Sequence, residues 1–250
     1  MPPEDERHAD HDWTSMGGSH VRLRVGADGV VEVLLDRPPL NIYDLDMRDG
    51  LIEAFAAARD HPDARALVLR ASGAHFSAGA DLTEFGSAPG IMAARRIRWE
   101  RDPWLPLWEL PVPTVAALHG YALGAGLEMS LLCDLRVAGP DTRVGLPETG
   151  LGMLPSAGGT QSLLRVVGAS RTLPLVLTGE RIDVERAERL GIIDVVSDDP
   201  DQHALELARH LAGLPPAAVR AAVRSLREGD GLPLHDALVA ERHLARMADS

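Results

Sequence analysis

The stretch HGYALGAGLEMSLLCD, residues 119–134, carries the strongest structural signal in the chain. The apolar run 112–120 that leads into it predicts a buried strand, and its glycines and alanines predict a tight turn before an apolar helix. One acid, Glu128, stands inside this apolar segment. Moving a carboxylate out of water costs roughly several kcal/mol unless it is paired, hydrogen-bonded or protonated. We therefore expect Glu128 to have a partner or a chemical role.

Two small-residue turns each connect a strand to a helix, one around Ala80 and one around Ala125. The first N–H groups of a helix have no partner within it and concentrate partial positive charge, so such a turn can bind an oxyanion. One N–H from each turn could meet at the same oxygen and form an oxyanion hole. Glu128 follows Ala125 by one helical turn, which would set its carboxylate beside that oxygen.

A second acid, Glu148 in GLPETGLG, stands in similar surroundings of proline and glycine. Two carboxyls near a polarised carbonyl can hold a water molecule and exchange protons with carbon. If they are close, each disfavours ionisation of the other, and burial also raises the pKa of both. The alternative is that Glu128 only begins a helix and that Glu148 is a solvated loop acid. Spacing alone leaves both interpretations open.

The remaining chain predicts a mixed α/β core followed by helices only. Residues 1–20 are polar and without periodicity, so we expect a flexible N-terminal tail there, an α/β core over 21–197 and a helical region over 198–250. The expected elements of the core are a hairpin around Asp28-Gly29, a helix over 44–59 capped by Asp44, strands at 66–72, 112–120, 135–139 and 143–146, helices over 91–102 and 161–167, a capped helix in RIDVERAERLG, and a short strand in IIDVVS.

Composition limits the class of protein. The 250 residues are 45% hydrophobic, which suits a globular protein, and the formal net charge of −12 argues against binding to nucleic acid or to an anionic membrane. Cys133 is the only cysteine, so an internal disulfide and a multi-thiolate zinc site are excluded, and its leucine neighbours predict a buried thiol. The sequence contains no H-E-x-x-H or similar metal motif, no long apolar run and no signal-peptide pattern, so we expect no metal site and a cytoplasmic location.

Four motifs together resemble the crotonase (enoyl-CoA hydratase/isomerase) superfamily. They are HFSAGADLTEF (75–85), PTVAALHGYALGAGLEMSLLCDLRVA (113–138), VGLPETGLGMLPSAGGTQSLLRVVG (144–168) and LTGERIDVERAERLGIIDVV (177–196). Their order and spacing match over residues 21–248. The resemblance implies an α/β crotonase-like fold, in which repeated ββα units form a spiral core. It also implies a C-terminal helical region that assembles a homotrimer or a dimer of trimers.

The same resemblance implies an activity and roles for named residues. The chain is most like an enoyl-CoA hydratase, whose substrate is an acyl-CoA thioester and which binds no permanent cofactor. The backbone N–H groups of Ala80 and Ala125 would hold the thioester carbonyl, and Glu128 and Glu148 would hold one water. Hydratases of the family have both acids, whereas isomerases commonly retain only the acid that matches Glu148.

Further positions are implied to contact the substrate or its coenzyme A part: Leu40, Ala78, Gly79, Asp81, Leu82, Thr83 and Gly124. Trp99, Trp104 and Trp108 would line the acyl pocket and favour short or cyclic acyl groups, or else they pack the core or a subunit contact. The chain departs from the family pattern at two of these motifs. Ala125 replaces a glycine and keeps the N–H in place only if its φ is negative. Thr83 stands where relatives often carry lysine, which leaves Arg37, Arg95 or Arg96 as candidates for the phosphates.

Several alternatives share the fold, which does not by itself determine function. They are a 3,2-enoyl-CoA isomerase, a cyclic dienoyl-CoA hydratase, a hydrolase of thioesters or β-dicarbonyls, and a non-catalytic binding protein. A further alternative reads HFSAG as a nucleophile elbow with Ser77 as the nucleophile, although its first glycine is replaced by His75.

Overall fold

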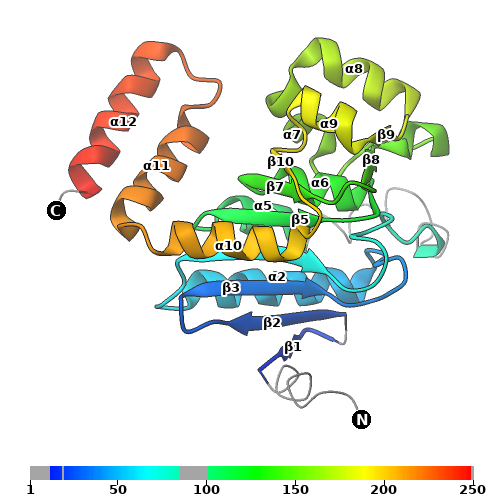
Figure 1. Cartoon of the computed structure of the whole chain (residues 1–250). Coiled ribbons are helices and arrows are strands. Elements are labelled where there is room, and N and C mark those ends of the chain that lie inside the picture. Colours follow the sequence, from blue (N-terminus) through cyan, green and yellow to red (C-terminus); the bar gives the residue numbers. More distant parts are fainter. Residues whose placement is uncertain (1–11, 19, 85–100, 249–250) are drawn as a thin grey trace.

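Seven strands form the main sheet in the part of the chain that the computed structural model describes, residues 12–18, 20–84 and 101–248 (Figure 1). Their order across the sheet is β1-β2-β3-β4-β5-β7-β10. The first three strands pair antiparallel, and β3, β4, β5, β7 and β10 run parallel. The bounds are β1 Thr14–Met16, β2 Val21–Val25, β3 Val30–Leu35, β4 Ala66–Ala71, β5 Thr114–Leu118, β7 Leu135–Ala138 and β10 Val195–Val196.

Both faces of this sheet are covered by helices. On one face lies α2 (Leu45–Asp60), whose N-cap Asp44 accepts a hydrogen bond from the N–H of Met47. Its apolar side packs on one set of strand residues, including Leu67 and Leu69, while the alternate residues face α10 (Pro200–Ala212) on the other side. Both sets are apolar, as expected for parallel strands buried on two sides. We expected the α/β core to end at residue 197. Helix α10 follows that residue and packs in the core, so the main body extends beyond it.

The chain advances as a spiral, which confirms the predicted fold class. The segments that follow β3, β4, β5 and β7 lie side by side in a second layer, in the same order as those strands. Parallel bridges join Tyr43 to Ala80 and Ser77 to Ala122. Next in this layer, β6 (Tyr121–Leu123) pairs parallel with β8 (Arg143–Gly145). Turns that are far apart in the sequence therefore become neighbours.

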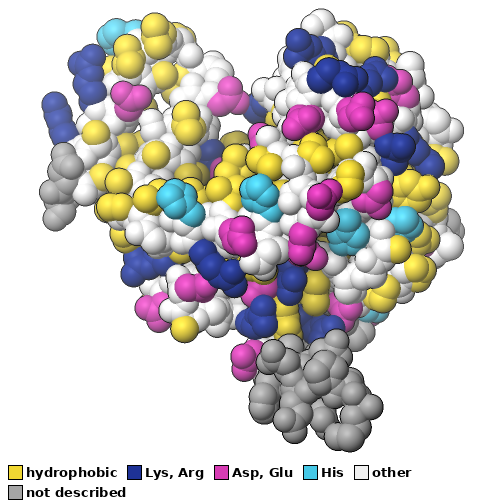
Figure 2. Space-filling model, in the orientation of Figure 1, with side chains coloured by type: hydrophobic (Ala, Val, Ile, Leu, Met, Phe, Trp, Pro, Cys, Tyr) yellow, Lys and Arg dark blue, Asp and Glu magenta, His cyan; other side chains and the backbone are white. Residues whose placement is uncertain are grey.

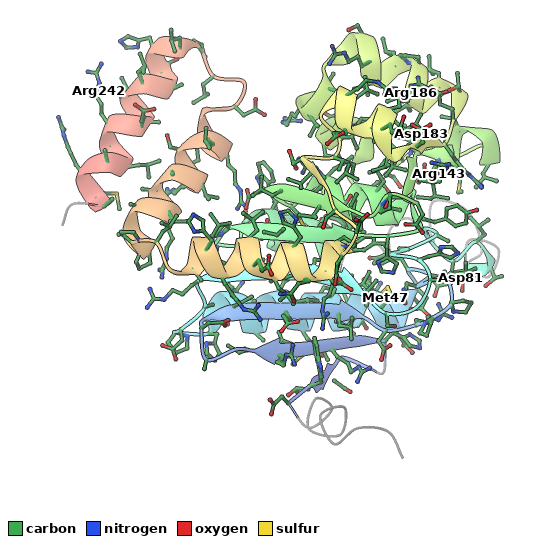
Figure 3. The ribbon with its side chains drawn as sticks, viewed as in Figure 1. Met47, Asp81, Arg143, Asp183, Arg186 and Arg242 are labelled. Atoms are coloured by element: carbon green, nitrogen blue, oxygen red, sulfur yellow. The ribbon has the colours of Figure 1, made fainter. Side chains whose placement is uncertain are left out.

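Short helices surround the second layer and complete the body. They are α5 (Trp104–Trp108), α6 (Ala125–Leu131), the 3-10 helix Pro147–Leu151, α7 (Gly159–Val167), α8 (Ala169–Thr178) and α9 (Val184–Leu190), with β9 (Ile182–Asp183) pairing antiparallel to β8. Asp183 caps α9 by accepting a hydrogen bond from the N–H of Arg186, and both residues lie at the start of that helix (Figure 3). The last two helices, α11 (Pro216–Gly229) and α12 (Leu234–Ala248), pack on each other and stand apart from the body (Figure 1).

Several elements were not predicted, among them β6, β9, α5 and the 3-10 helix, and two further misses have a clear physical cause. Residues 14–16 lie in the segment expected to be a flexible tail, yet they form β1 against β2, where the tail residue Gly17 also donates to Glu53 of α2. Helix α8 was missed because Pro174 lies inside it and Gly168 and Gly179 flank it, so its local sequence resembles a loop. The N-terminal residues 1–11 and most of the helix expected over 91–102 lie outside the described residues.

Candidate active site

The N–H of Ala80 points away from the neighbouring segment, which contains Tyr43. In the parallel bridge, Tyr43 donates its N–H to the carbonyl of Gly79 and accepts a hydrogen bond from the N–H of Asp81, both at 2.9 Å. This pairing uses the groups on either side of Ala80 and leaves its own N–H on the opposite side. Within the described chain that N–H donates no hydrogen bond, so it is available to a ligand.

Ala125 is the first residue of α6, where a helical N–H has no partner in its own helix. The unusual backbone angles fall on the residue before it, because Gly124 has φ 51° and ψ −124°. Gly124 donates its own N–H to the carbonyl of Gly145 at 2.9 Å. The condition that Ala125 must keep a negative φ is therefore met, since Asn41 is the non-glycine with a positive φ in the described residues.

These two turns touch each other. A Cβ placed on Gly79 would lie 3.1 Å from the carbonyl oxygen of Leu123 and 3.8 Å from the Cα of Gly124. Two residues after Gly124, a Cβ on Gly126 would lie 2.8 Å from the Cβ of Ser77. Only glycine permits this approach, so the small residues of both motifs are explained by their contact. The spiral thus brings the free N–H groups of Ala80 and Ala125 to neighbouring turns.

Glu128 is buried in α6, with 2% of its surface exposed. Its Oε1 accepts hydrogen bonds from the N–H of Ala157 at 3.0 Å and of Gly159 at 2.8 Å, and Gly159 begins α7. Burial and the charge of Glu148 raise the pKa of Glu128 to about 8, although the two N–H donors oppose that shift. Glu128 therefore keeps its proton more readily than an exposed acid, as we expected.

Glu148 lies in the 3-10 helix after β8 and approaches the turn of Gly124. A Cβ on Gly124 would lie 2.6 Å from the Oε1 of Glu148, so this glycine makes room for the carboxyl. Its Oε2 is buried and has no hydrogen-bond partner among the described residues. Burial raises the pKa of Glu148 as well. An unsatisfied carboxylate oxygen in an enclosed place implies that a water or substrate group completes it.

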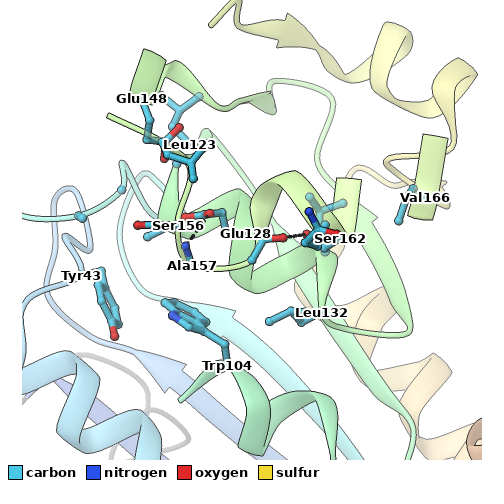
Figure 4. Close-up of a pocket in the computed structure, with 18 of the residues that line it drawn as sticks. Tyr43, Trp104, Leu123, Glu128, Leu132, Glu148, Ser156, Ala157, Ser162 and Val166 are labelled. Atoms are coloured by element: carbon cyan, nitrogen blue, oxygen red, sulfur yellow. Dashed lines mark hydrogen bonds between the residues drawn. The ribbon is translucent and has the colours of Figure 1, made fainter. Parts of the chain in front are cut away.

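Both glutamates line one cavity of about 1690 Å³, and so do Ala80 and Ala125. Figure 4 shows Glu128, Glu148, Tyr43 and Trp104 around it, and the rings of Tyr43 and Trp104 lie 5.0 Å apart between centroids. Most of the remaining lining is apolar, from residues such as Leu123 and Leu132. The arrangement can polarise a carbonyl with two N–H groups and transfer protons with two acids of raised pKa.

Comparisons with known proteins agree with this geometry. A family model described as enoyl-CoA hydratase/isomerase matches residues 26–248. The chain belongs to this family, the crotonase superfamily. It is 39% identical over 218 residues to the 2,3-dehydroadipyl-CoA hydratase of Escherichia coli (strain K12), covering 86% of this chain and 85% of that protein.

Solved structures of the family superpose on the chain over most of its length. An enoyl-CoA hydratase from Bacillus anthracis has a TM-score of 0.86 and 31% identity, covering 91% of this chain and 90% of its own. One from Mycobacterium smegmatis has a TM-score of 0.85 and 28% identity, covering 91% and 90%. The chain is thus an enoyl-CoA hydratase-like enzyme of the crotonase superfamily.

Most residues that the family resemblance implied meet at the cavity, and three do not. The lining includes Ala78, Gly79, Ala80, Leu82, Gly124, Ala125, Trp104 and Trp108. Leu40, Asp81 and Thr83 lie outside it: Leu40 accepts the N–H of Ala78 through its carbonyl, and Asp81 accepts both the N–H and the hydroxyl of Thr83. Contact of these three with the coenzyme stays a prediction. Trp99 and the arginines at 95 and 96 lie outside the described residues.

Three other predicted residues have structural roles. The Arg37 guanidinium lies 2.6 Å from Asp44 and also donates to the carbonyl of Ile42, so it is already engaged. Cys133 is buried, and burial, with a smaller effect of Asp134, raises the pKa of its thiol to about 12. Ser77 has no exposed surface, and its hydroxyl donates to the carbonyl of Asn41 at 2.8 Å. A role for Ser77 as an exposed nucleophile is therefore wrong.

The sequence analysis did not identify the groups that position the site residues from distant parts of the chain. The N–H donors to Glu128 come from residues 157 and 159, and Arg227 of α11 reaches the far end of the cavity. Among residues 12–18, 20–84 and 101–248, no group of three acids, histidines or cysteines could hold a metal ion. In the same residues, no helix combines the length and apolar character needed to cross a membrane.

Proposed function

We propose that this enzyme adds water across the 2,3 double bond of an enoyl-CoA thioester, through Glu128, Glu148 and a backbone oxyanion hole. The observation that carries the proposal is the meeting of two acids and two unpaired N–H groups in one cavity. The family membership and the relatives named as hydratases support the same activity. Both acids are present, whereas isomerases of the family commonly retain only the acid that matches Glu148.

The reaction begins with the thioester carbonyl bound between the N–H groups of Ala80 and Ala125. Withdrawal of electrons from the conjugated system makes Cβ electrophilic. A water held between the two carboxyls attacks Cβ as Glu128 removes one of its protons. Glu148 gives a proton to Cα, so OH is added at Cβ and H at Cα. The proton taken from water is left on Glu128 and passes to Glu148 before the next turnover. The negative charge that develops on the thioester oxygen is stabilised by the two N–H donors, each by about 3–4 kcal/mol.

The surroundings of the two acids favour one shared proton, but a pKa of about 8 keeps that proton on Glu128 at neutral pH, so the step requires its transfer to Glu148 before water attacks. The pair must hold one proton in the reactive form, on Glu148, with Glu128 ionised. Burial raises the pKa of both carboxyls, which retains a proton near neutral pH. The N–H groups of Ala157 and Gly159 stabilise the anion of Glu128 when it forms.

The acyl group is proposed to be short or cyclic. Trp104 and Trp108 line the cavity, and bulky indoles reduce the length available to a hydrocarbon chain. The Escherichia coli relative is named for 2,3-dehydroadipyl-CoA, so that thioester belongs in any substrate panel beside crotonyl-CoA and hexenoyl-CoA.

Turnover of such a panel in ¹⁸O- and ²H-labelled water tests the proposal. Oxygen label at Cβ with deuterium at Cα supports hydration. Exchange at Cα alone would identify an isomerase, and a free acid would identify a hydrolase; either result as the main product would contradict the proposal. Glu128→Gln and Glu148→Gln should each lower kcat for hydration by about 10²–10⁴-fold and leave binding of a saturated acyl-CoA nearly unchanged.

A homotrimer or a dimer of trimers is proposed as the assembly. Helices α11 and α12 expose large apolar side chains, namely Leu226, Leu234, Val239 and Met247, which a partner subunit would cover. Sedimentation as a monomer at micromolar concentration would refute it. The cytoplasmic location expected from the sequence stays a prediction.

A further inference from the structure

Helix α11 turns one face toward the cavity although it packs only loosely on the body. Val223, Leu226, Arg227 and Asp230 all line the cavity. Their spacing of three, four and seven residues places them on one side of the helix. No residue of α11 is fully buried, and α11 and α12 rise as a separate lobe across a hollow from the lobe of α7, α8 and α9 (Figure 2). Specific contacts must therefore hold α11 in place.

The strongest of these contacts is made by Arg227, whose side chain is only 11% exposed. Its Nε and Nη2 donate to both carboxylate oxygens of Asp134, at 2.7 to 3.1 Å. Its Nη1 donates to the carbonyls of Trp108 and Leu110, and the guanidinium lies 5.2 Å above the Trp108 ring. These bonds engage all the donors of the guanidinium. Arg227 thus ties α11 to the end of α6 and to α5.

A second ion pair holds the same face of α11 on the other side of the cavity. The Nε of Arg165, on α7, lies 3.1 Å from a carboxylate oxygen of Asp230. Both partners are about half exposed, so this pair contributes little stability by itself. Together with Arg227 it spans the cavity from α6 to α7.

The ion pairs of α11 are made with α6, or the turn that follows it, and with α7. These two helices also contain Glu128 and its hydrogen-bond donor Gly159. Glu128 precedes Asp134 by six residues along α6 and its following turn, and Gly159 precedes Arg165 by six residues along α7. At helical rise, six residues span roughly 9 Å. The lining between the two ends includes the apolar side chains of Leu131, Leu132 and Val166, together with the polar Gln161 and Ser162 of α7. A hydrocarbon chain that leaves the glutamates along this lining would therefore meet α11.

We propose that α11 forms the end wall of the acyl pocket and that Arg227, by fixing this wall, limits the length of the acyl chain. The inference rests on the proposed function, since it takes the apolar end of the cavity as the acyl site. Arg227 is a positioning and specificity-determining residue. It acts on the substrate through the position of Trp108 and Val223.

The test compares straight-chain 2-enoyl-CoA thioesters from crotonyl to dodecenoyl on the full-length enzyme. For the wild type, kcat/KM should fall by about tenfold or more beyond octenoyl. Arg227→Ala should raise the ratio of kcat/KM for dodecenoyl-CoA to that for crotonyl-CoA by about tenfold. Arg224→Ala is the matched control, because Arg224 lies on the same helix, pairs with Glu228 and does not line the cavity. Its ratio should equal that of the wild type.

Removing Arg227 leaves the carboxylate of Asp134 without its main partner, which can destabilise the fold. The double variant Arg227→Ala, Asp134→Asn removes both charges and should show the same change in chain-length ratio. Circular dichroism and sedimentation verify that each variant compared is folded and assembled as the wild type. Should both unfold, Trp108→Ala opens the same wall with the ion pair retained and should raise the ratio in the same way.

Binding of saturated acyl-CoAs of graded length separates this inference from the proposed function, since binding needs no turnover. Tighter binding of long chains by the folded Arg227 variant supports the end wall even if no enoyl-CoA is hydrated. An unchanged length profile, in binding and in turnover, overturns the inference while a wild type that hydrates crotonyl-CoA leaves the proposed function standing.

Discussion

Glu128 and Gly159 are in contact through one oxygen atom. The Oε1 of Glu128 accepts the N–H of Gly159 at 2.8 Å, and a Cβ added to Gly159 would lie 2.7 Å from that same oxygen. Glycine is therefore required at the start of α7 both to donate the hydrogen bond and to leave space for the carboxyl. The position of the proposed base depends on a residue 31 positions away in the chain.

Gly159→Ala should consequently displace Glu128. A misplacement of about 1 Å can cost on the order of 10²-fold in rate, so we expect kcat for crotonyl-CoA hydration to fall by about that factor. The control is Gly213→Ala, because Gly213 ends α10 with φ −76° and an added Cβ there makes only ordinary contacts of 3.5 Å. The measurement is kcat for crotonyl-CoA hydration by both variants, from steady-state kinetics. Equal activity in the two would contradict the role given to Gly159.

The two glutamates should produce a bell-shaped dependence of kcat/KM on pH. The reactive form holds one proton on the pair, so the rate falls at low pH when both carboxyls are protonated and at high pH when neither is. Burial raises the pKa of both, to about 8 for Glu128. We expect the alkaline limb near pH 8 and an acid limb above the ordinary range of a glutamate. Glu148→Gln should abolish the alkaline limb, and a profile that keeps it would argue against the pair.

Stability should also depend on the proton of Glu128. Its pKa in the folded protein is about 8, above the ordinary 4.5, so folding favours the protonated form. This contribution is fully present below pH 4.5 and is lost as the pH rises through 8. Relative to Glu128→Gln, the wild type should lose free energy of unfolding between pH 5 and 8, on the order of a few kcal/mol in total. Urea denaturation of both proteins across this range measures the difference. Parallel curves would mean that burial does not shift this carboxyl.

Ser77 should matter for stability and not for chemistry. Its hydroxyl donates to Asn41 and accepts the N–H of Gly79 at 3.2 Å, so it secures the turn that holds Ala80. Ser77→Ala removes both hydrogen bonds and should cost about 1–3 kcal/mol, seen as a lower midpoint in urea. Hydration of crotonyl-CoA should stay within a few-fold of the wild-type rate. Complete loss of activity in a folded variant would contradict this purely structural role of Ser77.

Local signals explain how much of this site could be predicted from the sequence. The glycines around Ala125 and the small residues around Ala80 encode turns within a few residues, so the two N–H groups could be predicted from the sequence. Glu148 was a candidate from its proline and glycine surroundings, and the family resemblance then implied its role. These predictions rest on short-range patterns or on whole motifs, and the cavity contains all of these residues.

Long-range contacts left no comparable signal. Nothing in LLRVV or VRSLREG indicates that Arg165 and Arg227 hold opposite sides of one cavity, because either side chain could equally serve a solvated helix face. The strand β1 is short and polar, and its pairing with β2 is a tertiary contact. Contact of Thr83 with the coenzyme came only from the family pattern, and in the structure Thr83 binds Asp81 at the surface.

Gly124 should act on the reaction only through Glu148. Since a Cβ on Gly124 would lie 2.6 Å from the Oε1 of Glu148, Gly124→Ala must move that carboxyl or the turn itself. With φ 51°, alanine is also strained at this position. We expect kcat for hydration to fall by about 10²-fold or more, as expected for a displaced general acid.

A double-mutant cycle distinguishes displacement of Glu148 from damage to the oxyanion hole. If Gly124→Ala acts by moving Glu148, it costs little further activity once Glu148→Gln is present, because the same function is already lost. If it instead shifts the N–H of Ala125, the two losses add in free energy. Binding of a saturated acyl-CoA is the second measurement, since a shifted N–H weakens it and a displaced Glu148 does not. Additive losses with weakened binding would show that Gly124 serves the oxyanion hole and that its contact with Glu148 is incidental.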